Sequence, residues 1–155
     1  MIMWNNTYMD FAEGIAKHSK ATKEKVGCVV VKDGQVISTG YNGTPPGYSN
    51  ICEEEVTLLE IDDGPDLKKL VTLPEVIHAE MNAIGKLAKS TVSSEGATLY
   101  VTKAPCWDCA KAIIAAGIGM VIFKGDRKKD KDRDSVSFLR LNDISVVIID
   151  DKYKY

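Results

Sequence analysis

Apolar residues recur along this chain at two spacings, and segments of the two kinds alternate. A spacing of three to four residues is typical of amphipathic helices, and it predicts helices over residues 7–17, 80–89, 106–116 and 136–141. Runs rich in β-branched and other apolar residues predict strands over residues 26–32, 35–41, 97–102, 120–123 and 144–149. Strands that alternate with helices indicate an α/β fold, with three α/β/α layers around one mixed, five-stranded sheet.

Several short signals mark the ends of these elements. Asn5 or Asn6 is a candidate cap for the first helix. The Asp33-Gly34 pair predicts a two-residue turn that joins the first two strands into a β-hairpin, because both turn positions need positive φ. Pro105 favours the start of the third helix and Gly117 its end. Cys28 lies inside the first apolar strand and is interpreted as a small buried hydrophobe.

Residues 51–74 and 125–134 fit the alternation poorly. The first segment has an acidic start, a short helical pattern through Leu58 and Ile61, a break at Gly64-Pro65 and room for another helical turn over residues 66–71. We interpret it as a variable insertion between the hairpin and the helix at 80–89, within a single domain that spans residues 1–155. The second segment is dense in charges of both signs, which predicts a solvated loop.

Composition narrows the possible partners and compartment. The chain has 155 residues, 45% hydrophobic and 27% charged, with a formal net charge of −2. This charge gives no electrostatic case for binding a nucleic-acid polymer. The sequence shows no signal-peptide pattern and no apolar run long enough to span a membrane. Four cysteines are too few for a disulfide scaffold, so we expect a reducing, cytoplasmic location, or the host cytoplasm for a viral protein.

Two motifs combine metal ligands with an acid. His78 and Glu80 begin the helix at 80–89, and Cys106 and Cys109 begin the helix at 106–116. The cysteine spacing directs both thiols to one point, and the positive end of a helix dipole favours the thiolates that a metal requires. One histidine and two cysteines leave the fourth tetrahedral position of Zn²⁺ open for water, which the metal acidifies. Glu80 is placed to carry the proton of that water.

This chemistry suits the hydrolytic deamination of an amino-heterocycle. His-x-Glu followed by Pro-Cys-x-x-Cys is itself a known signature of zinc deaminases. The missing fourth protein ligand argues against a structural zinc knuckle with an incidental glutamate. His18 is interpreted as a solvent-facing histidine at a helix end, and Cys52 as too isolated to build a second metal site.

The segment 41–48 holds two glycines and two prolines, so it predicts an ordered loop. Two interpretations stay open from its composition. It is either a structural turn or a ligand site lined by exposed backbone amides and the side chain of Asn42.

Several of these segments together resemble the deoxycytidylate (dCMP) deaminase family, known from phages and from cellular pyrimidine metabolism. The matching segments are Val26-Gly27-Cys28-Val29-Val30, Gly40-Tyr41-Asn42-Gly43-Thr44-Pro45, His78-Ala79-Glu80-Met81-Asn82-Ala83-Ile84, and Tyr100-Val101-Thr102 with Pro105-Cys106-x-x-Cys109. The zinc motif alone indicates the wider cytidine-deaminase-like superfamily and its fold. The loop and the helix motif narrow the resemblance to the nucleotide branch.

The resemblance implies hydrolysis of dCMP to dUMP, which feeds thymidylate synthesis. It implies Zn²⁺ bound by His78, Cys106 and Cys109, with Glu80 as the proton carrier. Substrate contacts are implied for Asn42 with the deoxyribose, for the backbone at Ala79 with the base, and for Ser19 and Lys20 near the phosphate.

The resemblance also implies regulation. Members of the family are often homohexamers that dCTP activates and dTTP inhibits, with Mg²⁺ bound to the regulatory nucleotide. The implied regulatory residues are Asn42, Gly43, Thr44, Pro46, Gly47 and Lys89.

The chain departs from the family after Phe123, where the loop is unusually charged. Phosphate contacts therefore do not carry over to that loop, and its lysines leave dCTP open as a second substrate. The competing hypotheses are a deaminase of tRNA adenosine or of free cytosine and, outside enzymes, a structural zinc or nucleotide-binding protein.

Overall fold

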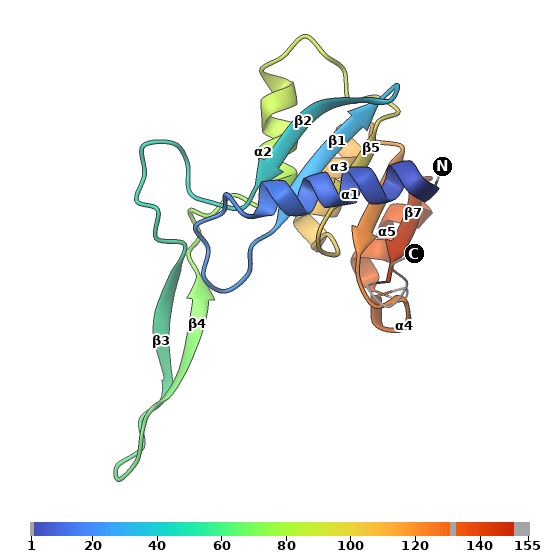
Figure 1. Ribbon diagram of the computed structural model, residues 1–155. Coiled ribbons are helices and arrows are strands. Elements are labelled where there is room, and N and C mark those ends of the chain that lie inside the picture. The colour runs from blue at the N-terminus through green and yellow to red at the C-terminus, as the bar shows by residue number, and fades with distance from the viewer. Residues whose placement is uncertain (1, 131–132, 151–155) are drawn as a thin grey trace.

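The computed structural model describes residues 2–130 and 133–150, and a five-stranded sheet forms its centre (Figure 1). In spatial order the strands are β2 (Gln35–Tyr41), β1 (Gly27–Lys32), β5 (Thr98–Val101), β6 (Met120–Lys124) and β7 (Ser145–Ile149). β1 runs antiparallel to both of its neighbours, whereas β6 runs parallel to β5 and β7. The predicted mixed, five-stranded sheet is confirmed.

Helices cover both faces of this sheet. The four helices of the outer layers are α1 (Ile2–Ala16), α2 (Ala79–Ala88), α3 (Trp107–Ala115) and α5 (Asp134–Leu141). Figure 1 shows α1 on one face and α2, α3 and α5 on the other. Met9 and Ala12 of α1 pack against strand residues such as Val29, which gives one core layer. The three-layer α/β/α arrangement is therefore confirmed.

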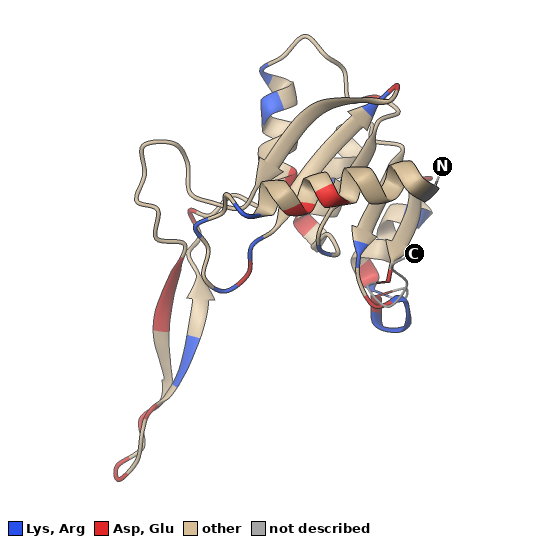
Figure 2. Ribbon diagram, in the orientation of Figure 1, with Lys and Arg blue, Asp and Glu red and all other residues tan. Residues whose placement is uncertain are grey.

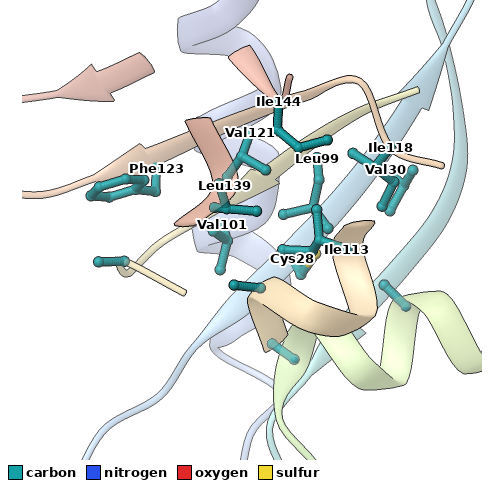
Figure 3. Close-up of a cluster of buried hydrophobic side chains, with 14 of the residues drawn as sticks. Cys28, Val30, Leu99, Val101, Ile113, Ile118, Val121, Phe123, Leu139 and Ile144 are labelled. Atoms are coloured by element: carbon teal, nitrogen blue, oxygen red, sulfur yellow. The ribbon is translucent and has the colours of Figure 1, made fainter. Parts of the chain in front are cut away.

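The larger core layer lies under α2, α3 and α5. Figure 3 shows Leu99 and Val121 of the sheet beside Ile113 of α3 and Leu139 of α5, all of them fully buried. Cys28 is also fully buried in this layer, so its interpretation as a small core residue is confirmed. Since successive residues of a strand point to opposite faces, each central strand contributes side chains to both core layers.

Two glycines allow helices to approach the sheet very closely. A Cβ atom at Gly40 would lie 2.2 Å from the carbonyl oxygen of Ala79, and one at Gly27 would lie 1.9 Å from that of Ala12. The Ser38 hydroxyl also donates to the Ala83 carbonyl at 2.8 Å. The contact of Gly27 holds α1 against β1. The contacts of Gly40 and Ser38 hold α2 against β2, and with it the residues that precede that helix.

The β1–β2 hairpin has the predicted turn, with positive φ at Asp33 (50°) and Gly34 (74°). Gly117, with φ 70°, follows α3 as expected for a residue that ends a helix. The predicted cap of α1 was wrong, because Asn5 and Asn6 lie inside the helix. The side-chain oxygen of Asn5 instead accepts a hydrogen bond from the Tyr100 hydroxyl at 2.9 Å.

Residues 53–72 form a second, two-stranded sheet, which corrects the predicted helical turns. β3 (Glu53–Leu59) and β4 (Leu67–Thr72) pair antiparallel and extend away from the main sheet (Figure 1). Val56 and Thr57 are β-branched and favour a strand, and Lys68 forms an ion pair with Glu55 across the hairpin at 2.9 Å. Figure 2 shows acidic residues on β3 and at the hairpin tip, with basic residues on β4. The interpretation of 51–74 as an insertion in a single domain stays a prediction.

The predicted loop at 125–134 contains a short helix, α4 (Arg127–Asp130), so this expectation was partly wrong. The Asp126 carboxylate accepts the backbone N–H of Lys128 at 2.9 Å, which caps the helix start. Residues 131 and 132 of the predicted loop lie outside the described residues. Among the helices of residues 2–130 and 133–150, none has the length and apolar character needed to cross a bilayer.

Candidate metal centre and active site

The N-termini of α2 and α3 bring three metal-ligating side chains together. His78 is the N-cap residue of α2, and Cys106 is the N-cap residue of α3. The Cys106 thiol accepts the backbone N–H of Cys109 at 3.4 Å, so the second cysteine lies one turn into the helix beside the first. Partial positive charge at both helix ends therefore faces the same small volume.

The geometry of this cluster suits a metal ion. His78 Nδ1 lies 3.4 Å from Cys106 Sγ and 3.5 Å from Cys109 Sγ. The three ligand atoms all lie within 4.8 Å of one another. Two thiols and one imidazole are the donor set that zinc prefers, and three such ligands leave one tetrahedral position open. The residues present therefore fit a zinc ion with an open coordination site.

Glu80 lies one residue into α2 and is 5% exposed. Burial raises the pKa of its carboxyl above the ordinary value, against the lowering effects of its own backbone N–H and of His78. A buried carboxyl with a raised pKa holds a proton closer to neutral pH than an exposed glutamate does, which suits a group that accepts and returns protons.

Cys109 is fully buried beside this carboxyl. Burial, followed by the neighbouring Glu80 and Cys106, raises the pKa of the Cys109 thiol well above its ordinary value. These groups concentrate potential negative charge in a small buried space. A divalent cation would relieve their repulsion and favour the thiolates.

A cavity of about 170 Å³ opens onto His78, Glu80 and Cys106. Its walls also include two of the predicted substrate contacts, Asn42 and Ala79. Val26, from one of the matching segments, also lines the cavity. Lining residues that the sequence did not single out are Lys23, Glu24, Glu53, Thr72, Val76, Lys103 and Ala104. These residues come from four separate segments, so no local motif in the chain predicts them.

Asn42 and Ser19 are held in a network of backbone contacts. The Asn42 amide donates to the Glu24 carbonyl at 2.8 Å and accepts from the Val26 backbone N–H at 2.8 Å. The buried Ser19 hydroxyl donates to the Asn42 carbonyl at 2.6 Å. Both side chains thus shape the loops that form the cavity wall, and the Ser19 hydroxyl is directed to the backbone.

The predicted regulatory residues fall in different places. Gly43, Thr44, Pro46 and Gly47 line a second cavity of about 240 Å³, whose walls also include His18, Lys20, Tyr41, Pro45, Tyr48, Asn50 and Cys52. Lys20, the predicted phosphate neighbour, therefore lies in this second cavity. Asn42 lines the first cavity, and Lys89 is the C-cap residue of α2, at the other end of that helix from His78.

The chain belongs to the family described as "Cytidine and deoxycytidylate deaminase zinc-binding region", whose model it matches over residues 2–124. Among its relatives is the deoxycytidylate deaminase of Enterobacteria phage T4, 36% identical over 81% of this chain and 80% of the phage protein. The human deoxycytidylate deaminase is 36% identical over 90% of this chain and 74% of the human protein.

A solved structure shares the fold. The dCMP deaminase of cyanophage S-TIM5, crystallised in complex with dCMP and dUMP, aligns with a TM-score of 0.75 and 35% identity. The alignment covers 93% of this chain and 95% of the cyanophage chain. The resemblance to deoxycytidylate deaminases and their fold is therefore confirmed.

Proposed function

We propose that this chain is a zinc-dependent enzyme that hydrolyses dCMP to dUMP and ammonia. The observation that carries the proposal is the cluster of His78, Cys106 and Cys109 beside the buried carboxyl of Glu80 in one cavity. The deoxycytidylate deaminases of phage T4 and human, and the cyanophage enzyme crystallised with dCMP and dUMP, support this substrate.

His78, Cys106 and Cys109 would hold the zinc ion. When bound, zinc supplies a Lewis acid that makes a water molecule nucleophilic at neutral pH. His78 and Cys106 of this cluster line the same cavity as Glu80. These residues therefore supply the two requirements of the reaction, a nucleophilic oxygen and a carrier for its proton.

Glu80 moves the protons. Its carboxylate accepts one proton from the attacking water and delivers it to the ring nitrogen of cytosine. It then accepts the second proton from the new hydroxyl, which becomes the carbonyl, and gives this proton to the departing amine. A C–O bond forms at the ring carbon, the C–N bond breaks, and ammonia leaves.

Three contacts would orient the nucleotide. The backbone at Ala79, in the cavity wall, would meet the base, and Asn42 would meet the deoxyribose. For the phosphate, the resemblance implies Ser19 and Lys20, but the Ser19 hydroxyl donates to the Asn42 carbonyl and Lys20 lines the second cavity. The wall of the first cavity itself offers the cations Lys23 and Lys103.

Regulation by dCTP and dTTP with Mg²⁺, in a homohexamer, is the second part of the proposal. The cavity lined by Gly43, Thr44 and Gly47 supports it, because Lys20 in the same wall offers a cationic contact for a polyphosphate. A dCMP saturation curve that neither dCTP nor dTTP alters would overturn this part. Sedimentation of the zinc-loaded protein tests the hexamer.

An ultraviolet deamination assay across dCMP, dCTP, CMP, deoxycytidine and cytosine tests the substrate. We expect dCMP to have the highest kcat/KM, and the dCTP arm decides whether triphosphates are also accepted. A highest kcat/KM for cytosine would instead support a free-base deaminase.

The variant Glu80→Gln tests the chemistry. We expect kcat for dCMP to fall by about a factor of 10²–10⁴, the typical contribution of a general acid–base group, with bound zinc retained. The matched control is Glu75→Gln, an exposed glutamate shortly before the same helix, which should keep its activity. Near-native turnover by Glu80→Gln would refute the proton-carrier role.

A further inference from the structure

A carboxylate of the chain itself occupies an anion-binding turn in the wall of the active-site cavity. The two carboxylate oxygens of Glu53 accept hydrogen bonds from the backbone N–H of Thr22 at 3.1 and 3.2 Å. They also accept the backbone N–H of Lys23 at 3.2 Å and the hydroxyl of Thr22 at 3.0 Å. Three donors from two consecutive residues thus converge on one anionic group.

Such a turn has no intrinsic preference for a carboxylate. Consecutive backbone N–H groups form a concave site for anions, and phosphate oxygens accept the same hydrogen bonds. Lys23 adds a cationic side chain to the same cavity wall. The wall therefore holds the groups that recognise a phosphate monoester, in a cavity that also reaches His78 and Glu80.

The turn does not depend on Glu53 for its position. On one side, Ser19 accepts the backbone N–H of Ala21 at 3.2 Å and donates to the Asn42 carbonyl. On the other side, the Asn42 amide binds the backbone of Glu24 and Val26. Anchors on both flanks account for the shape of the turn, which leaves the Glu53 carboxylate as its occupant.

We propose that the Thr22–Lys23 turn is the receptor for the 5′-phosphate of the nucleotide, and that Glu53 is a built-in competitor for that receptor. The inference rests on the proposed function, in that the ligand of the cavity is a nucleotide. Glu53 thereby sets how strongly the enzyme prefers a phosphorylated nucleoside to the same nucleoside without phosphate.

The position of Glu53 makes it an effective competitor. It is the first residue of β3, and the base of the hairpin is fixed by a hydrogen bond from the Leu73 N–H to the Cys52 carbonyl at 2.9 Å. A tethered group competes at a high effective concentration. Partial burial raises the pKa of Glu53, but the hydrogen bonds from Thr22 and Lys23 outweigh this and lower it, so the group is ionised at neutral pH.

Calorimetric titration of the zinc-loaded protein with dUMP and with deoxyuridine measures the contribution of the phosphate without turnover. In Glu53→Gln we expect the ratio of the deoxyuridine Kd to the dUMP Kd to rise about three- to fivefold, as for the loss of one partly solvated like charge. Glu54→Gln changes the net charge equally at an exposed neighbour on the same strand and should leave the ratio unchanged. An unchanged or lower ratio in Glu53→Gln would overturn the inference.

A second variant locates the phosphate. In the Glu53→Gln background, Thr22→Val removes the Thr22 hydroxyl, one of the three donors of the turn. If Glu53 were still present, the same substitution would also weaken the competitor, which would hide part of the loss in phosphate binding. Relative to Glu53→Gln alone, we expect the ratio of the deoxyuridine Kd to the dUMP Kd to fall about tenfold, which is the usual contribution of a hydrogen bond to a charged group. A ratio that does not change would show that the phosphate binds elsewhere and would overturn the inference.

Turnover separates this inference from the proposed function. A protein that shows these binding ratios but does not deaminate dCMP would refute the proposed function alone. Normal deamination of dCMP with no change of ratio in Glu53→Gln would refute the role of Glu53 alone.

Discussion

Strands β1 and β3 show how differently two parts of this molecule are stabilised. Residues 27–31 of β1 are all buried between two helical layers, whereas six of the seven residues of β3 are exposed. An isolated two-stranded hairpin is at best marginally stable in water, while a sheet covered on both faces carries a hydrophobic core. The main sheet with its helices therefore accounts for stability and for the metal ligands. The hairpin contributes Glu53 to the cavity wall.

Removal of zinc should affect the two regions most unequally. Because the metal would join the N-termini of α2 and α3, its removal should abolish activity. It should also lower the free energy of unfolding by about 4 kcal/mol, compared with the protein in free zinc at about a thousand times the Kd. Hydrogen exchange should accelerate at the start of both helices and stay unchanged in β3 and β4. Equal acceleration in the hairpin would contradict the separation of the two regions.

The same substitution in each region tests the difference in burial. Leu139 of α5 is fully buried, whereas Leu58 of β3 is 57% exposed. Leu139→Ala should lower the free energy of unfolding by about 3 kcal/mol, because it removes buried methyl groups and leaves a cavity. Leu58→Ala should change it by less than about 0.5 kcal/mol.

Urea denaturation of the zinc-loaded variants measures both values. A cost for Leu58→Ala close to that for Leu139→Ala would show that β3 is covered in solution by another surface. The difference in burial between Leu139 and Leu58 would then hold for the isolated chain only and would be absent from an assembly of several chains.

Shortening the hairpin should have the smallest effect. Replacement of residues 55–70 by an Asn-Gly turn keeps Glu53 and should change the free energy of unfolding by less than about 1 kcal/mol, since the stability of the chain depends weakly on loop length. Thermal unfolding and a dCMP assay measure the outcome. A shortened protein that fails to fold would show that the hairpin supports the main sheet.

The contrast also explains which elements the sequence could predict. Where a strand or helix is buried on one or both faces, its apolar residues repeat at a fixed period, and the five central strands were predicted for this reason. The hairpin has no such pattern, because Leu58, Leu59 and Ile61 are all largely exposed and their spacing fits a helical turn as well as a strand. Only the Gly64-Pro65 break was informative, and it lies in the connection between β3 and β4.

The candidate site divides in the same way. His78, Glu80, Cys106 and Cys109 were recognisable because each pair lies within one helix start, where the spacing along the chain fixes the spacing in space. Glu53 joins the turn at Thr22–Lys23 only through the folded chain, and neither segment carries a motif. The short helix α4 was predictable in part. Asp126 is a recognisable N-cap residue. Because the residues after it are nearly all charged, the segment was interpreted as a loop.

The pairing of β1 with β5 allows the length of the β3–β4 hairpin to change at little cost in stability. Cys28 lies opposite Val101, so formation of the main sheet closes a long loop that includes β2, the β3–β4 hairpin and α2. The entropy lost on closing such a loop grows only with the logarithm of its length, by about 0.6 kcal/mol for each doubling. Residues can therefore be added to or removed from the hairpin with little penalty for the chain. The segment that carries Glu53 is the part of the protein in which length, charge and affinity for phosphate can change without rebuilding the catalytic centre.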